Sequence, residues 1–187
     1  MNMNKINTIN CIKNHIYFKG DVTMKNMNFL CNTISKFNIH KNKFGKSPLY
    51  LHITTNGGDV YGGLMAYDYI RNSKIPIYTI AEGMCFSSGT ILLMGGKKRY
   101  MLPNSYLMIH QIRSSFGDGK LCELRDDYVN TINLSNKLIN IYIKHTELDK
   151  THIEELLKKD IILDSTYCIK HKIINEIAQC KNNISFI

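Results

Sequence analysis

The sequence predicts a mixed α/β fold, with strands and helices stacked in layers and a long helix standing apart from them. Predicted strands and helices alternate over about the first hundred residues, a pattern typical of layered α/β domains. Farther along, residues 120–145 carry apolar side chains mostly three or four positions apart, which indicates one long amphipathic helix. Because no internal repeat or Pro- or Ser-rich linker interrupts the chain, residues 11–187 are predicted to form one domain after a flexible, Asn-rich tail at 1–10.

The first half of the chain provides the predicted layers. Met27, Leu30, Ile34 and Phe37 recur at helical spacing, and Asp59 is placed to cap the start of the next helix. The expected order is a strand at 15–18, a helix at 24–37, a strand at 49–54, a helix after Asp59, a strand at 75–81 and an apolar helix at 90–94.

The second half is predicted to contain a hairpin and several helices. Pro103 and Asn104 form the expected hairpin turn. The expected elements are paired strands at 99–102 and 106–109, the long helix at 120–145, a helix at 150–159, an extended piece at 160–163, a helix at 165–171 and a last extended piece at 173–174.

Composition excludes several classes of function. Hydrophobic residues make up 44% and charged residues 21% of the 187, which is ordinary for a globular protein. The formal charge is +9, but the lysines are scattered and form no tract interleaved with aromatics, so no nucleic-acid partner is expected. No apolar run is long enough to cross a membrane, and the polar first ten residues are not a signal peptide.

The six cysteines give no indication of a metal or disulfide site. None falls in a C-x-x-C pair and no histidine stands at zinc-ligand spacing beside them. Free thiols in a reducing compartment are therefore expected, at Cys11, Cys31, Cys85, Cys122, Cys168 and Cys180.

Three features of the sequence could carry chemistry. Gly57-Gly58 ends a strand just before a helix, where backbone N–H groups can approach a negative charge, although most such pairs are only tight turns. Ser87 lies in a second strand-to-helix turn, as a nucleophile or as a simple helix cap. His110 ends a strand, where most histidines are structural or solvated. Together with a later acidic residue they provide the parts of an acyl-transfer site.

Several motifs resemble, in the same order, those of the Clp protease proteolytic subunit, ClpP. The segment from Leu51 to Gly58 is similar to the family's strand ending in Ser-Pro-Gly-Gly, and Gly83 to Thr90 resembles its nucleophile turn. Leu102-Pro103-Asn104-Ser105 and Met108-Ile109-His110-Gln111 resemble two further signatures closely. Lys159-Asp160 resembles the segment with the catalytic aspartate, and the likeness extends from about Cys11 to Ile177.

The resemblance implies a serine-type endopeptidase with a crotonase-like spiral core and a protruding handle helix at about 120–145. In such a site Ser87 is the nucleophile, His110 the general base and Asp160 its orienting acid, while the N–H groups of Gly58 and Ser88 bind the oxyanion. The implied assembly is a homo-oligomeric or mixed heptamer ring, two of which enclose a chamber fed with unfolded proteins by an AAA+ unfoldase. The partner uses ATP; the chain itself is expected to need no cofactor or metal and to bind no membrane.

Departures from the family pattern keep a second alternative open. Asn56 replaces a proline, Phe86 and Ser88 flank the nucleophile where smaller residues and methionine are usual, and Ile112 replaces another proline; Lys159 and Ile161 stand beside Asp160 where arginines are typical. A non-catalytic ClpR-type ring subunit would show such changes around a retained Ser-His-Asp set. A crotonase-type acyl-CoA enzyme is a third alternative. The expected location is an organelle of bacterial origin, of the plastid or apicoplast type, or a bacterial-type cytoplasm.

Overall fold

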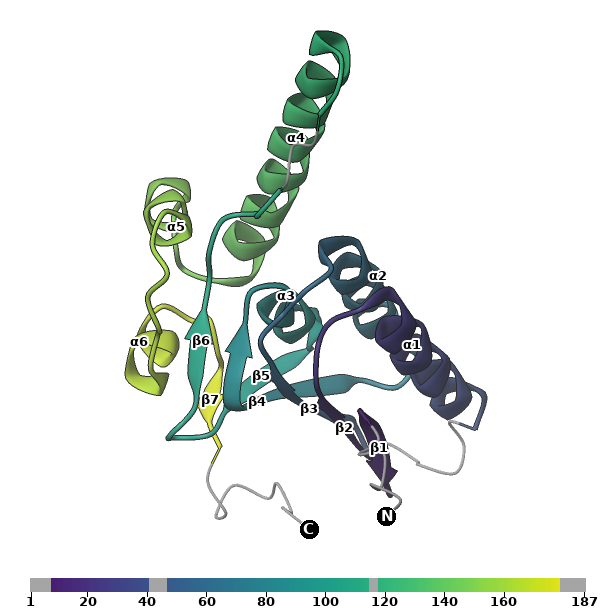
Figure 1. Cartoon of the computed structure of the whole chain (residues 1–187). Coiled ribbons are helices and arrows are strands. Elements are labelled where there is room, and N and C mark those ends of the chain that lie inside the picture. Colours follow the sequence, from purple (N-terminus) through teal and green to yellow (C-terminus); the bar gives the residue numbers. More distant parts are fainter. Residues whose placement is uncertain (1–7, 41–46, 115–117, 179–187) are drawn as a thin grey trace, which may run out of the picture.

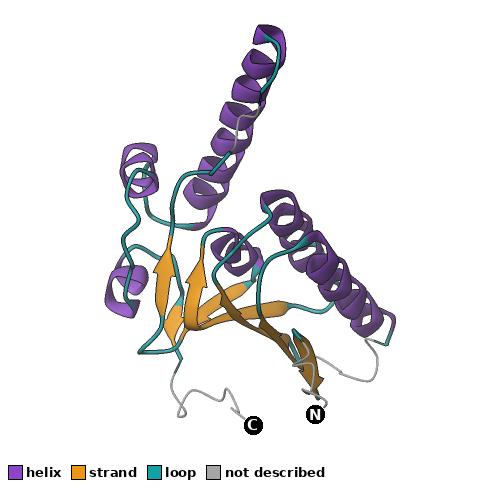
Figure 2. Cartoon of the chain, in the orientation of Figure 1, coloured by secondary structure: helices purple, strands orange, loops and turns teal. Residues whose placement is uncertain are grey.

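The computed structural model describes residues 8–40, 47–114 and 118–178, and it has a seven-stranded sheet with helices packed against it (Figures 1 and 2). The strand order is β1-β2-β3-β4-β5-β7, and β6 pairs with β4 off this path. Among the named strands of the described residues, β1 and β2 pair antiparallel and the other strand pairs are parallel. The strands are β1 (Ile9–Ile12), β2 (His15–Lys19), β3 (Leu49–Thr55), β4 (Ile77–Phe86), β5 (Lys98–Met101), β6 (Tyr106–Met108) and β7 (Glu176–Ile177).

The helices confirm the mixed α/β prediction and the long helix. In Figure 1, α1, α2 and α3 lie together over one face of the sheet, while α4 projects well beyond it. The helices are α1 (Met24–Ile39), α2 (Val60–Arg71), α3 (Ser88–Gly95), α4 (Leu121–His145), α5 (Lys150–Leu157) and α6 (Ser165–Lys170). None of the helices in the described ranges is both long and apolar enough to cross a membrane.

Local sequence signals explain where the helices begin. Thr23 caps α1 by accepting the Asn26 N–H at 3.1 Å, and Asp59 caps α2, as predicted, by accepting the Gly62 N–H at 2.9 Å. At the start of α4 the Lys120 N–H donates to the Glu123 carboxylate at 2.9 Å. Each side chain satisfies a backbone group that the first turn leaves unpaired.

The predicted hairpin at 99–109 is wrong. β5 pairs with the first part of β4 (Tyr78–Ala81) and β6 with its last part (Met84–Phe86), both in parallel. β4 also runs five residues beyond the predicted end at Ala81, and Gly83 within it has a φ of 61°. Because β5 and β6 both add to this one long strand, the chain from β6 onward lies beside the Ser87 turn.

Two smaller expectations at the chain ends also differ from the structure. Residues 1–7 of the expected tail lie outside the described residues, but Ile9 and Asn10 belong to β1, which pairs with β2. The last extended piece lies at β7 rather than at 173–174, because the Ile173 and Ile174 N–H groups both donate to the Cys168 carbonyl oxygen in the turn after α6.

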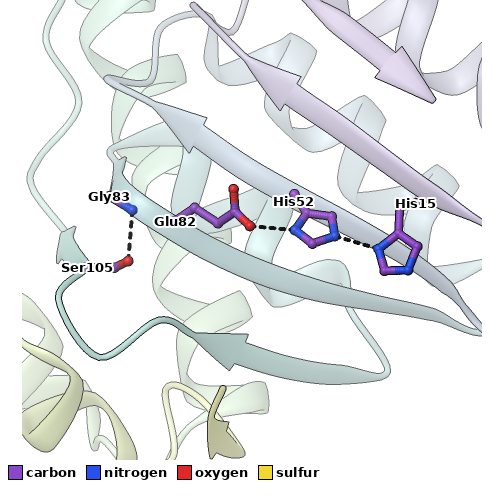
Figure 3. Close-up of polar contacts among 5 residues, drawn as sticks. All are labelled: His15, His52, Glu82, Gly83 and Ser105. Atoms are coloured by element: carbon purple, nitrogen blue, oxygen red, sulfur yellow. Dashed lines mark hydrogen bonds and ion pairs between the residues drawn. The ribbon is translucent and has the colours of Figure 1, made fainter. Parts of the chain in front are cut away.

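The sheet face opposite α1–α3 carries a buried polar chain that crosses three strands (Figure 3). His15 Nδ1 lies 2.8 Å from His52 Nε2, and His52 Nδ1 lies 2.6 Å from a Glu82 carboxylate oxygen. Tyr17 and Tyr50 stack on these rings. Burial, His52 and Lys13 lower the pKa of His15, so the cluster favours a neutral His15.

The base of α4 is fixed to the core by a buried arginine. The Arg99 guanidinium donates to the backbone oxygens of Ile173 at 2.8 Å, His145 at 2.7 Å and Lys172 at 3.0 Å. Burial, reinforced by nearby cations that include Arg71 and Arg99, lowers the pKa of His145 to about 4. A neutral His145 shares a hydrogen bond with the Tyr67 hydroxyl, whose Oη lies 2.8 Å from His145 Nε2. The last turn of α4 is thereby held in one position against the layered core.

Candidate active site

Ser87 stands at a strained turn between β4 and α3. Its backbone has φ 55° and ψ −128°, a conformation that L residues adopt only when the surrounding structure enforces it. The Ser87 N–H donates to the Met108 oxygen at 2.8 Å, and its side chain makes no cap bond to α3. Ser87 is therefore not the simple helix cap that the sequence left open. A strained strand-to-helix turn is the geometry that exposes a nucleophilic hydroxyl.

Gly57 lies directly beside Ser87, and Gly58 lies against the backbone of Val22. A Cβ on Gly57 would come within 2.5 Å of the Ser87 Cβ, and one on Gly58 within 2.3 Å of the Val22 oxygen. Both glycines also have positive φ, 97° and 138°. Gly57 is thus required for the loop after β3 to approach the Ser87 turn, and Gly58 for the same loop to approach the Val22 backbone.

His110 follows β6, and a second segment is fastened against it. Leu107 and Leu163 exchange N–H···O bonds of 2.9 and 2.7 Å, and the Gln111 N–H donates to the Leu157 oxygen at 2.8 Å. These bonds lie on both sides of Asp160 along the chain. They place Asp160 next to His110 although 50 residues separate the two in sequence.

The contact between His110 and Asp160 is loose. His110 Nδ1 lies 3.8 Å from an Asp160 carboxylate oxygen, which is longer than a hydrogen bond. The other carboxylate oxygen lies 3.4 Å from the Arg113 guanidinium, a partner that the sequence did not predict. The Asp160 side chain is 59% exposed, whereas that of His110 is 15% exposed. Within the described residues no hydrogen bond joins His110 to Ser87, so the three side chains are neighbours without forming a closed triad.

One cavity of about 400 Å³ brings the predicted residues together. Gly58, Ser87, Ser88, His110 and Asp160 all line it, and an apolar wall completes it. That wall consists of Val60, Phe86, Ile91, Met108, Ile112, Leu138, Tyr142 and Leu157. Phe86 therefore finds room at the edge of the cavity, and the arrangement can hold an apolar group beside a serine hydroxyl.

Two residues that the sequence reasoning missed contact the Ser87 turn. The Thr90 hydroxyl donates to the backbone carbonyl oxygen of Ser87 at 2.7 Å and lies 2.6 Å from the Tyr142 hydroxyl. Tyr142 belongs to α4 and lies 52 positions from Thr90 along the chain, so no local sequence pattern predicts that the two side chains meet. A tyrosine on the core-facing stripe of a helix reads from sequence as packing only.

The described part of the chain offers no cluster for a metal ion, and its buried thiols are held protonated. No group of three or more His, Cys, Asp or Glu side chains in it could hold a metal ion. Burial raises the pKa of the Cys31 thiol to about 11 and that of Cys168 to about 12. These two cysteines therefore stay protonated. Cys180, expected to be free, lies outside the described residues.

Comparison with known proteins identifies the family of this chain. The family model described as Clp protease matches residues 3–181, nearly the whole chain. The chain belongs to the Clp protease family. It is also 34% identical over 134 residues to the ATP-dependent Clp protease proteolytic subunit of Deinococcus radiodurans. That match covers 71% of this chain and 65% of the relative, which is less than two thirds of the relative's length.

Proposed function

We propose that this chain is a proteolytic subunit of a Clp-type serine protease. The observation that carries the proposal is the strained turn at Ser87, which opens onto the same cavity as His110 and Asp160. A strained nucleophile persists only where neighbouring structure fixes it, and such strain concentrates at functional sites.

The proposed reaction is acyl transfer from a peptide bond. Ser87 Oγ attacks the peptide carbonyl while His110 takes the proton of the Ser87 hydroxyl. The oxyanion that forms accepts hydrogen bonds from the N–H groups of Gly58 and Ser88. His110 then gives the proton to the leaving amine. Water, activated by His110, hydrolyses the acyl-enzyme and restores Ser87. Asp160 stabilises the imidazolium, which requires the 3.8 Å gap between the two side chains to close.

The protruding part of α4 supports an oligomeric assembly. Residues 121–137 of the helix include no buried side chain, and Leu121, Tyr128, Val129 and Ile132 are among the exposed large apolar residues. Such residues on one helix gain stability by packing against another subunit. A ring of copies of this chain or of related subunits, supplied with unfolded proteins by an ATP-driven unfoldase, is the assembly we propose.

A non-catalytic subunit of the same ring is the second candidate. The loose contact of His110 with Asp160 and the competing Arg113 favour it, because a general base that is not oriented loses most of its effect. In that case the chain would shape the chamber of a mixed ring while other subunits supply the activity.

Labelling with a fluorophosphonate separates the two candidates. Purified protein is treated with the probe and read by intact mass, beside Ser87→Ala, with the oligomer size recorded. The peptidase proposal predicts one adduct per chain that is lost in Ser87→Ala. An assembled double ring that gains no adduct would contradict it and support the non-catalytic role.

A further inference from the structure

The Ser87 turn is held by a chain of hydroxyl groups that begins on α4. The backbone carbonyl oxygen of Ser87 accepts both the Thr90 N–H at 2.9 Å and the Thr90 hydroxyl at 2.7 Å. A carbonyl oxygen only accepts, so the single hydroxyl hydrogen of Thr90 is used there. The Tyr142 hydroxyl, 2.6 Å from Thr90 Oγ1, must therefore be the donor in the next bond. The order of donation is fixed from Tyr142 to Thr90 to Ser87.

Both hydroxyls of this chain are closed to water. Thr90 is fully buried and Tyr142 is 3% exposed. Burial raises the pKa of Tyr142 far above its ordinary value, so the phenol keeps its proton and remains a donor. In such surroundings a lost partner is not replaced by solvent, and the remaining polar group is left unsatisfied.

The two peptide groups on either side of Ser87 are held by different elements. Its N–H is bound by the Met108 oxygen of β6, and its oxygen by Thr90 of α3. These bonds oppose relaxation of the strained φ of 55°, and they fix where the side chain points. The bond to β6 continues the pairing of β4 with β6. The bond between the Tyr142 and Thr90 hydroxyls, in contrast, belongs to no helix or strand.

We propose that Tyr142, acting through Thr90, is a positioning residue that keeps Ser87 in its reactive orientation. Neither hydroxyl contacts the reacting atoms in this scheme. The inference rests on the proposed peptidase function, because only a nucleophile needs an orientation of this kind.

The test compares variants that break this series of hydrogen bonds from Tyr142 to Ser87 with variants that preserve it. Thr90→Val and Tyr142→Phe each remove one hydroxyl and little volume, and we expect the rate of fluorophosphonate labelling to fall about tenfold in each, as for loss of 1 to 1.5 kcal/mol. The double variant should be no slower than the slower single one, because both substitutions break the same chain. Thr90→Ser, which keeps the hydroxyl, should label within about twofold of the unmodified protein.

Tyr67→Phe is the matched control. It removes another tyrosine hydroxyl bonded to the last turn of α4, 2.8 Å from His145 Nε2, but that bond does not lead to Ser87. We expect it to lower stability without slowing the labelling. In peptide hydrolysis Thr90→Val should lower kcat rather than raise KM, since Thr90 does not line the cavity.

Equal labelling rates for Thr90→Val and the unmodified protein would overturn the inference, and so would an equal slowing in Tyr67→Phe. A complete lack of labelling of the unmodified protein in an assembled double ring would overturn the proposed function instead. Amide hydrogen exchange over residues 84–94 then decides the positioning role. Faster exchange in Thr90→Val and Tyr142→Phe than in Tyr67→Phe supports it, and unchanged exchange overturns it.

Discussion

Replacing Gly57 with alanine is expected to abolish labelling of Ser87 while the chain still folds. The new Cβ would lie 2.5 Å from the Ser87 Cβ and 2.8 Å from the Phe86 oxygen, and the φ of 97° is itself unfavourable for alanine. The contact can be relieved only by moving the loop after β3 away from the Ser87 turn. A displacement of about 1 Å at a catalytic group costs on the order of 10²-fold in rate, so we expect at least that loss.

The same substitution should lower the free energy of unfolding by about 2 to 3 kcal/mol, from the contact and the strained backbone together. Gly83→Ala is the matched control, because its φ of 61° is also positive but nothing lies within 4 Å of the added Cβ. It should cost about 1 to 2 kcal/mol and leave labelling measurable. If Gly57→Ala labels as fast as Gly83→Ala, the glycine pair is not part of the site.

Replacing His110 with alanine should reduce peptide hydrolysis on the order of 10²- to 10⁴-fold, as for the loss of a general base. His110 is mostly buried in the wall of the cavity that Ser87 also lines, so water cannot easily take over its part. Folding should change little, because no hydrogen bond of the His110 side chain occurs within the described residues. Urea unfolding measures the second expectation, and steady-state kinetics the first.

An exposed histidine provides the comparison for this variant. His40, at the end of α1, is exposed, and His40→Ala should keep full activity. A His110→Ala protein that hydrolyses peptides as fast as His40→Ala would show that His110 is not the base. It would leave the contact with Asp160 as a surface ion pair of little consequence.

Features with a local cause were predictable from the sequence. Asp59 correctly predicted the start of α2, and the spacing of apolar residues predicted the start of α4 to within one residue. Gly58, Ser87 and His110 line one cavity. The order of the motifs and the family resemblance implied that they belong to one site, whereas the predicted hairpin did not, because its second strand would end at the opposite edge of the sheet.

Features that depend on distant partners were not predictable. Two strands separated by Pro103-Asn104 look like a hairpin, and only the length of β4 shows that both pair with it instead. The same holds for the bond between Thr90 and Tyr142 and for the pairing of Arg113 with Asp160. Each joins residues more than 40 positions apart, and neither has a period or motif that would mark it.

Turnover of a short apolar fluorogenic peptide decides whether this chain hydrolyses peptide bonds with Ser87, as we propose. The protein is assayed at its natural oligomer size beside Ser87→Ala prepared in parallel. We expect hydrolysis by the unmodified protein and a loss of about 10⁶-fold, to background, in the variant. Equal rates for the two proteins, or no turnover by an assembled double ring, would contradict it.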